Sequence, residues 1–68
     1  MTIKNKKRRT WLTNLRVERN LSQAEIADFV NVTQQMYGYV ESGKRNPSPR
    51  LAKKIAKVLD FDWTKFYD

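Results

Sequence analysis

Residues 23–42 form the stretch that most constrains how this chain can fold. They read QAEIADFVNVTQQMYGYVES, with an interruption in the middle at Asn31. Apolar side chains recur at helical spacing on both sides of this interruption, at Ile26, Ala27, Val30, Val32, Tyr37 and Val40. Because that spacing places the apolar residues of each half on one face, it predicts two short helices that cross and share one small core.

Cap and turn residues indicate where the helices begin and end. Ser22 and Glu25 have the spacing of a capping box, in which each residue bonds the backbone N–H of the other. The candidate N-caps are Thr10, Ser22, Thr33, Ser48 and Asp62. The residues expected to end helices in a left-handed conformation are Asn20, Asn31, Gly43 and Asp60. We therefore expect five helices, over residues 10–19, 22–30, 33–42, 48–59 and 63–67.

The composition indicates one small all-α domain without covalent or metal support. The chain has 68 residues, 40% of them hydrophobic, and no alternating β-branched run that would predict a strand. With no cysteine and no histidine, it lacks thiolate ligands, disulfides and the commonest general base. We therefore expect neither an enzyme nor a metal or other cofactor. No apolar run approaches the roughly 20 residues that span a bilayer, and no signal peptide is visible, so we expect a cytoplasmic protein.

The charge distribution points to a polyanionic partner. The formal net charge is +7, and five of the fourteen Lys and Arg residues lie within residues 4–9. We interpret residues 1–9 as a basic arm and residues 10–68 as the folded domain. The arm is either a solubilising tail or a segment that contacts DNA phosphates or enters a minor groove.

Three sequence segments resemble those of the phage-repressor helix-turn-helix family of the Cro/cI or XRE type. They are LRVERNLSQAEIADFVNVTQQ, YVESGKRNPS and LAKKIAKVL, and together they cover nearly all of the folded part. The start of the second helix of the motif, Thr33-Gln34-Gln35, is similar to that of the phage 434 branch. The resemblance implies a compact five-helix, lambda-repressor-like domain, in which the helices over 22–30 and 33–42 form the DNA-reading unit.

The same resemblance implies several residue roles. Arg16 and Glu41 would form a partly buried ion pair that fixes the recognition helix against the body. Gln23, at the N-terminus of its helix, would contact the DNA backbone, where N–H groups and the positive dipole end favour phosphate. Asn31 and Asp60 replace glycines that are usual in the family. Tyr37 replaces a smaller aliphatic residue, so we expect it to be only partly buried, with its hydroxyl at an edge.

The residues on the outward face of the recognition helix are candidates for reading bases. Gln34 and Gln35 lie at its start, the end that usually reaches base edges, and Tyr39 lies one turn further on. Glutamine can form two hydrogen bonds with adenine, and tyrosine can contact a thymine methyl or a phosphate. The alternative is a solvated helix face. Gly38, which costs roughly 1 kcal/mol in a helix relative to alanine, reflects either a close approach or simple tolerance.

Cations flank this helix and are candidates for contacts with the DNA backbone. With Gln23, the predicted set is Lys44, Arg45 and Asn46 in the loop after the helix and Lys6, Lys7, Arg8 and Arg9 in the arm. The alternative for the loop is a basic segment that serves solubility. Phosphate contacts would position the protein on a duplex without selecting its sequence.

Taken together, these features predict a sequence-specific DNA-binding transcriptional regulator. A repressor is favoured because occupying a promoter requires only binding, and a palindromic operator would be read by a homodimer. The aromatic residues near the C-terminus would either cover the core or form the dimer contact, and they are Trp63, Phe66 and Tyr67. The alternatives are a helical protein–protein interaction module and a non-specific DNA-binding protein, for which charge placement and the specificity ratio are the discriminators.

Overall fold

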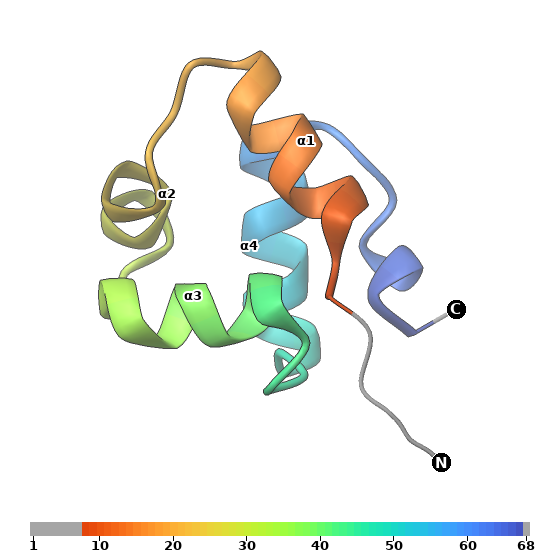
Figure 1. The fold of residues 1–68 in the computed structure, drawn as a ribbon. Coiled ribbons are helices and arrows are strands. Elements are labelled where there is room, and N and C mark those ends of the chain that lie inside the picture. The colour runs from red at the N-terminus through yellow and green to blue at the C-terminus, as the bar shows by residue number, and fades with distance from the viewer. Residues whose placement is uncertain (1–7, 68) are drawn as a thin grey trace, which may run out of the picture.

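In the computed structural model, residues 8–67 are described, and they form a helical domain (Figure 1). Its elements are α1 (Thr10–Glu18), α2 (Gln23–Val30), α3 (Gln34–Ser42), α4 (Pro49–Leu59) and the 3-10 helix η1 (Trp63–Tyr67). Residues 8–67 contain no β-strand, so the all-α class is confirmed. The fifth element is a single short 3-10 segment rather than an α-helix, and Asp62 Oδ1 accepts a hydrogen bond from Thr64 N at its start.

Three of the predicted caps organise the helix starts. Ser22 Oγ accepts a hydrogen bond from Glu25 N at 3.0 Å, and Glu25 Oε1 accepts one from Ser22 N at 2.8 Å, which confirms the capping box. Thr33 caps α3, and Ser48 caps α4 ahead of a proline at the first helical position. Thr10 was wrongly predicted as a cap: it is already the first residue of α1, and no side chain caps that helix.

The turns after the helices use the left-handed backbone that their residues predicted. Asn20, Asn31 and Asp60 all have positive φ, at 57°, 65° and 59°. Gly43 ends α3 at a φ of 83°. Asn31 therefore makes the turn between α2 and α3 without a glycine, which leaves α3 directed across the end of the body (Figure 1).

The core lies where α1, α2, α3 and α4 meet, and Tyr37 is part of it. Its side chain is fully buried, so the expectation of partial burial with an edge hydroxyl was wrong. Tyr37 belongs to one buried cluster together with Leu12, Ile26, Val30, Val40, Ile55 and Leu59. Within residues 8–67 the hydroxyl has no hydrogen-bond partner of ordinary geometry, but it lies beside the Glu41 carboxylate. Burial first, and then Glu41, raises the pKa of Tyr37 far above its usual range.

An aromatic cluster attaches the C-terminal 3-10 helix to α1. The ring centroids of Trp11 and Phe66 lie 5.4 Å apart, and those of Trp11 and Phe61 lie 5.1 Å apart, both in edge-on arrangements. Phe66 is buried in this chain's own core, so it covers the core as one of the two alternatives predicted. Trp63 is half-buried, and Tyr67 stays 46% exposed. Among residues 8–67, no helix has the length and apolarity needed to cross a membrane.

Candidate nucleic-acid interface

The N-cap of α3 determines which side chains stand at its exposed end. Thr33 Oγ1 accepts a hydrogen bond from Met36 N at 3.0 Å, so Gln34 and Gln35 occupy the first turn. Both glutamines are exposed, and Tyr39 follows one turn later, half-buried. The inner face of α3 is held in the core by Tyr37 and Val40. This division leaves one face of the helix polar and open to a partner.

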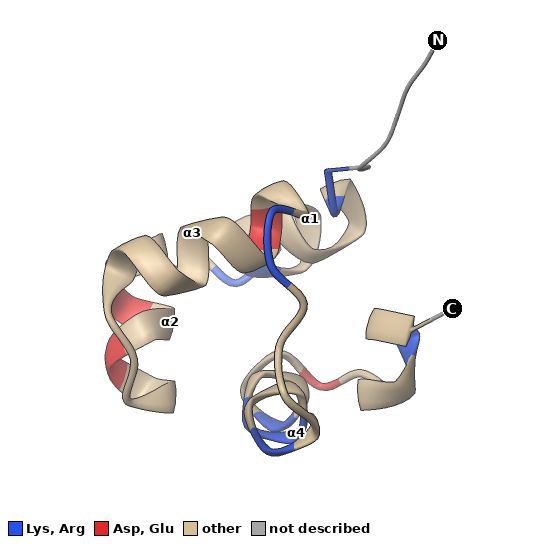
Figure 2. Ribbon diagram, turned by 90° about the horizontal axis from the view of Figure 1, so that it is seen from below, with Lys and Arg blue, Asp and Glu red and all other residues tan. Residues whose placement is uncertain are grey.

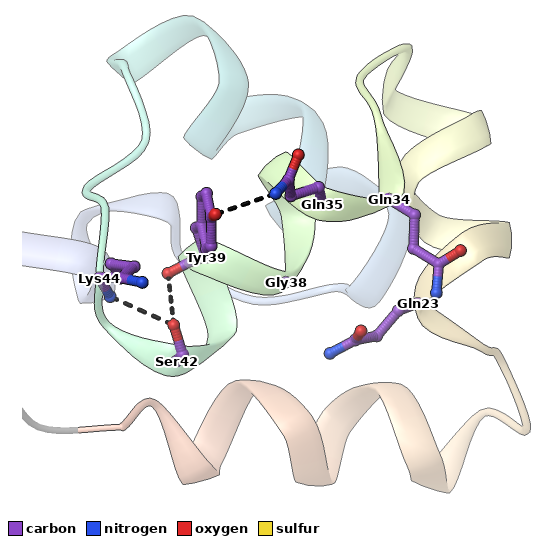
Figure 3. Close-up of a pocket in the computed structure, with 7 residues that line it drawn as sticks. All are labelled: Gln23, Gln34, Gln35, Gly38, Tyr39, Ser42 and Lys44. Carbon is purple, nitrogen blue, oxygen red and sulfur yellow. Dashed lines mark hydrogen bonds between the residues drawn. The ribbon is translucent and has the colours of Figure 1, made fainter.

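An open groove of about 920 Å³ runs along this face of α3 (Figure 3). It brings together the predicted base-reading residues with two predicted backbone contacts, Gln23 and Lys44. Its full lining is Gln23, Gln34, Gln35, Gly38, Tyr39, Ser42 and Lys44. Ser42 was not predicted; its spacing of three residues from Tyr39 and four from Gly38 was the available signal.

Tyr39 makes a hydrogen bond and cation–π contacts with other residues at and beside the groove. Its hydroxyl accepts a hydrogen bond from Gln35 Nε2 at 3.0 Å (Figure 3). Lys44 Nζ lies 4.9 Å from the centre of its ring, and the guanidinium carbon of Arg45 lies 6.0 Å from it. Such cation–π contacts draw the cations of the loop back toward α3. Tyr39 thus joins a predicted base reader to predicted phosphate contacts.

Gln23 enters the groove from the first turn of α2 and is oriented by α3. Its Nε2 donates to Glu41 Oε1 at 3.1 Å. Its Oε1 lies 3.5 Å from the place where a Cβ on Gly38 would stand, which is an ordinary van der Waals separation. Within residues 8–67, no other side chain approaches this position closely, and a methyl group on Gly38 would lie at the groove that Gly38 lines.

The ion pair between Arg16 and Glu41 links α1 to the last turn of α3. Arg16 Nε lies 2.5 Å from Glu41 Oε2, and Glu41 is only 2% exposed. The carboxylate also accepts hydrogen bonds from Thr13 Oγ1 at 2.8 Å and from Gln23. Burial alone would raise the pKa of Glu41, but the hydrogen bonds, led by that of Arg16, outweigh it and lower the pKa. The pair therefore holds α3 at a fixed orientation on the body.

The predicted backbone contacts lie at the C-terminal end of α3 and beside it. Lys44, Arg45 and Asn46 are exposed in the loop between α3 and α4, and Arg8 is exposed at the end of the arm. Figure 2 shows Lys and Arg at both places, whereas the acidic residues of α2 lie at the far end of α3. Lys6 and Lys7 lie outside the described residues. Further Lys and Arg residues lie on α4, which is separate from α3 in this view (Figure 2).

Arg9 differs from the other predicted backbone contacts because its guanidinium is turned toward the protein. It is half-buried and donates hydrogen bonds to the end of α3 and to the loop that follows. Burial lowers the pKa of Arg9, and the nearby Tyr67 acts in the opposite direction. The sequence signal for this placement was weak, since the residues that Arg9 contacts lie more than 30 positions further along the chain.

The sequence of this chain is similar to those of known proteins. A family model described as helix-turn-helix matches residues 12–66. An HTH-type transcriptional regulator of Bacillus subtilis, YqaF, is 38% identical over 60 residues, covering 88% of this chain and 79% of the relative. An HTH-type transcriptional regulator of Archaeoglobus fulgidus is 40% identical over 52 residues, covering 76% of this chain and 73% of the relative. The SPbeta prophage-derived regulator YonR of Bacillus subtilis is 35% identical over 48 residues, covering 71% of this chain and 44% of the relative.

The chain therefore belongs to the helix-turn-helix family. This confirms the resemblance at the level of the family, and α2 and α3, the two helices predicted to form the motif, both lie within the matched residues. The likeness of the start of α3 to one branch of the phage repressors stays a prediction.

Proposed function

We propose that this helix-turn-helix protein is a sequence-specific DNA-binding transcriptional regulator that inserts α3 into the major groove. The observation that carries the proposal is the shared face of Gln34, Gln35 and Tyr39, which is open, polar and followed directly by a basic loop. A recognition helix needs base-reading groups at its exposed start and cations where the phosphate strands pass. The relatives named as transcriptional regulators support the same class.

Base reading would rest mainly on the two glutamines. Gln35 Nε2 gives one hydrogen to Tyr39, which leaves its second hydrogen and the Oε1 acceptor available. One donor beside one acceptor matches N7 and N6 of adenine, and such a pair contributes about 1–3 kcal/mol of discrimination. Gln34 is exposed on the same turn, and the Tyr39 hydroxyl keeps its own hydrogen for a base or a phosphate.

Backbone contacts would set the position of the protein on the duplex. The exposed Lys44, Arg45 and Asn46 follow α3, and Arg8 lies at the end of the arm with Lys6 and Lys7 before it. Gln23 would approach the adjacent strand from the start of α2, where the helix dipole favours phosphate. Arg9 was predicted as a member of this set, but its guanidinium is turned toward the protein and donates to Val40, Arg45 and Asn46.

Repression and dimerisation complete the proposal. A palindromic operator read by a homodimer would place two copies of α3 about 34 Å apart, one helical turn along the duplex. The contact would include the exposed part of the C-terminal segment, Trp63 and Tyr67, because Phe66 is buried in the monomer. Occupying a promoter requires binding alone, so we propose a repressor that needs no cofactor and performs no catalysis.

Selection of bound sequences from a random duplex library tests the proposal. We expect a palindromic motif whose half-sites contain adenines at the positions facing Gln34 and Gln35. The matched control is the Gln34→Ala, Gln35→Ala double variant, which should keep salt-dependent affinity for any duplex but lose the motif. Enrichment of no sequence by the wild type would instead favour a non-specific DNA-binding protein, and no affinity for duplexes at all would favour a protein–protein interaction module.

A further inference from the structure

The loop between α3 and α4 is held by residues from both ends of the described chain. From the N-terminal side, Arg9 Nη1 donates to the backbone oxygen of Arg45 at 3.1 Å, and Arg9 Nη2 donates to Asn46 Oδ1 at 2.6 Å. From the C-terminal side, the Tyr67 hydroxyl donates to the backbone oxygen of Pro47 at 2.8 Å. Three consecutive loop residues are therefore each bonded to a side chain outside the loop.

Arg9 is itself anchored, so it can hold the loop rather than follow it. Its backbone N donates to Glu41 O at 2.8 Å, and its Nη1 also donates to Val40 O at 2.7 Å. Its guanidinium carbon lies 5.4 Å from the centre of the Phe66 ring. A cation at the last carbonyl groups of a helix is favoured by the helix dipole. Arg9 thus connects the end of α3, the loop and η1 through one planar group.

This arrangement determines which atoms of the loop face a partner. Because Asn46 Oδ1 accepts from Arg9, the amide turns its Nδ2 donor away from Arg9. A phosphate oxygen accepts hydrogen bonds, so Nδ2 is the end of the amide that a DNA backbone needs. A loop ordered before binding also avoids the entropy that its side chains and backbone would otherwise lose in the complex.

We propose that Arg9, assisted by Tyr67, is the positioning residue for the loop of residues 44–47 and is not itself a phosphate contact. The inference rests on the proposed DNA binding at this face, and it assigns Arg9 a different role from that of Lys44 and Arg45. A lysine cannot replace it, because a single ammonium group cannot reproduce the planar fork that reaches Val40, Arg45 and Asn46 together.

The test compares Arg9→Lys and Arg9→Met with the wild type on two duplexes, the selected site and an unrelated sequence. A positioning residue predicts that both variants bind both duplexes about 3- to 10-fold more weakly, the loss expected when one or two side chains must be ordered on binding. It also predicts an unchanged slope of log K against log salt for both variants, because neither loses a phosphate contact. A direct phosphate contact predicts wild-type affinity for Arg9→Lys and a slope flattened by about 0.9 for Arg9→Met; that result would overturn the proposal.

Tyr67→Phe provides a second variant that removes only one hydroxyl group, should the Arg9 variants fail to fold. Tyr67→Phe should weaken binding to both duplexes by a similar factor and leave the slope of log K against log salt unchanged. Affinities are measured well below the melting temperature of each variant. Arg19→Lys is the matched control, since the Arg19 side chain contacts its own helix far from the loop and should bind as the wild type. Wild-type affinity of both Arg9→Lys and Tyr67→Phe would refute the positioning role alone, whereas a wild type that binds no duplex would remove the proposed function as well.

A double-mutant cycle between Arg9 and Asn46 separates positioning from independent contacts. If Arg9 acts through Asn46, Arg9→Lys should cost little further affinity in an Asn46→Ala background. Fully additive losses would show that the two side chains act separately and would contradict the proposal.

Discussion

Gln23 donates a hydrogen bond through its side-chain amide to Glu41, the buried carboxylate that also pairs with Arg16. The same carboxylate therefore fixes α3 on α1 and orients a side chain at the start of α2 that lines the groove. Packing of the body and orientation of a residue that lines the proposed DNA-binding groove are therefore coupled at Glu41. Changes at the ion pair should consequently alter both stability and binding.

Replacement of Glu41 by glutamine tests this coupling. Removing one partner of a buried pair costs on the order of 3–5 kcal/mol, so the free energy of unfolding should fall by a large fraction. Because folding lowers the pKa of Glu41, its contribution is fully present above about pH 4.3, the usual value for an unfolded chain, and is lost as the pH falls through the lower folded pKa. Urea unfolding at several pH values should show the difference between wild type and Glu41→Gln shrinking in acid. A difference that stays constant with pH would mean that the carboxylate is not responsible.

Gln35→Ala should remove one base-specific contact. We expect a loss of about 1–3 kcal/mol on the best site and a relaxed preference at one base pair of each half-site. Competition binding with single-base variants of the selected site measures both effects. Equal weakening on every sequence would show that Gln35 does not read a base.

Tyr39→Phe separates the hydroxyl of Tyr39 from its ring. The ring and its contacts with Lys44 and Arg45 remain possible, but Gln35 Nε2 loses the acceptor that orients its amide. We expect a smaller loss than for Gln35→Ala, at the same base pair, and little further effect in a Gln35→Ala background. A change of preference at a different base pair would instead assign Tyr39 its own base contact.

Gly38→Ala should affect stability and binding in opposite directions. Alanine is favoured over glycine in a helix by roughly 1 kcal/mol. Among the described residues, the added methyl group would meet Gln23 Oε1 alone, at an ordinary distance, so the melting temperature should rise. The same methyl group projects into the groove and should weaken DNA binding. Thermal unfolding and DNA affinity, measured on the same preparation, would show whether Gly38 is needed for close approach of DNA or is simply tolerated in the helix. Unchanged affinity in a stabilised variant would favour tolerance.

The elements that could be predicted from sequence are those determined by neighbouring residues. Ser22, Thr33 and Ser48 cap helices by accepting a hydrogen bond from the backbone N–H three positions ahead. Asn31 and Asp60 have the left-handed backbone that their residue types favour. These signals were sufficient to predict α2, α3 and α4, and therefore most of the residues that line the groove.

The errors arose where distant parts of the chain decide the outcome. Arg9, the residue before α1, is bonded through its N to Glu41 O, a contact that no local pattern at Thr10 could indicate. Tyr37 is buried in a cluster to which α1, α2, α4 and η1 also contribute side chains, and these elements lie elsewhere in the sequence. The orientation of the Arg9 guanidinium likewise depends on a loop more than 30 residues away, so composition could predict a cation in the arm but not its partner.

The last prediction concerns assembly on DNA. One recognition helix reads too few base pairs to select one site among the many competitors in a genome, so a second copy on the opposite half-site is expected. Burial of Phe66 leaves Tyr67 and the exposed part of Trp63 as the aromatic surface available for that contact, and exposed aromatic residues are enriched at interfaces.

Sedimentation of the complex with a full palindrome should show two protomers per duplex, and a duplex carrying one half-site should bind one protomer more weakly. Because Tyr67 also holds Pro47, Trp63→Ala is the variant to compare, provided that its melting temperature shows a folded protein. It should lower the affinity for the palindrome and leave the half-site unaffected, whereas a single protomer on the full palindrome would contradict the dimer.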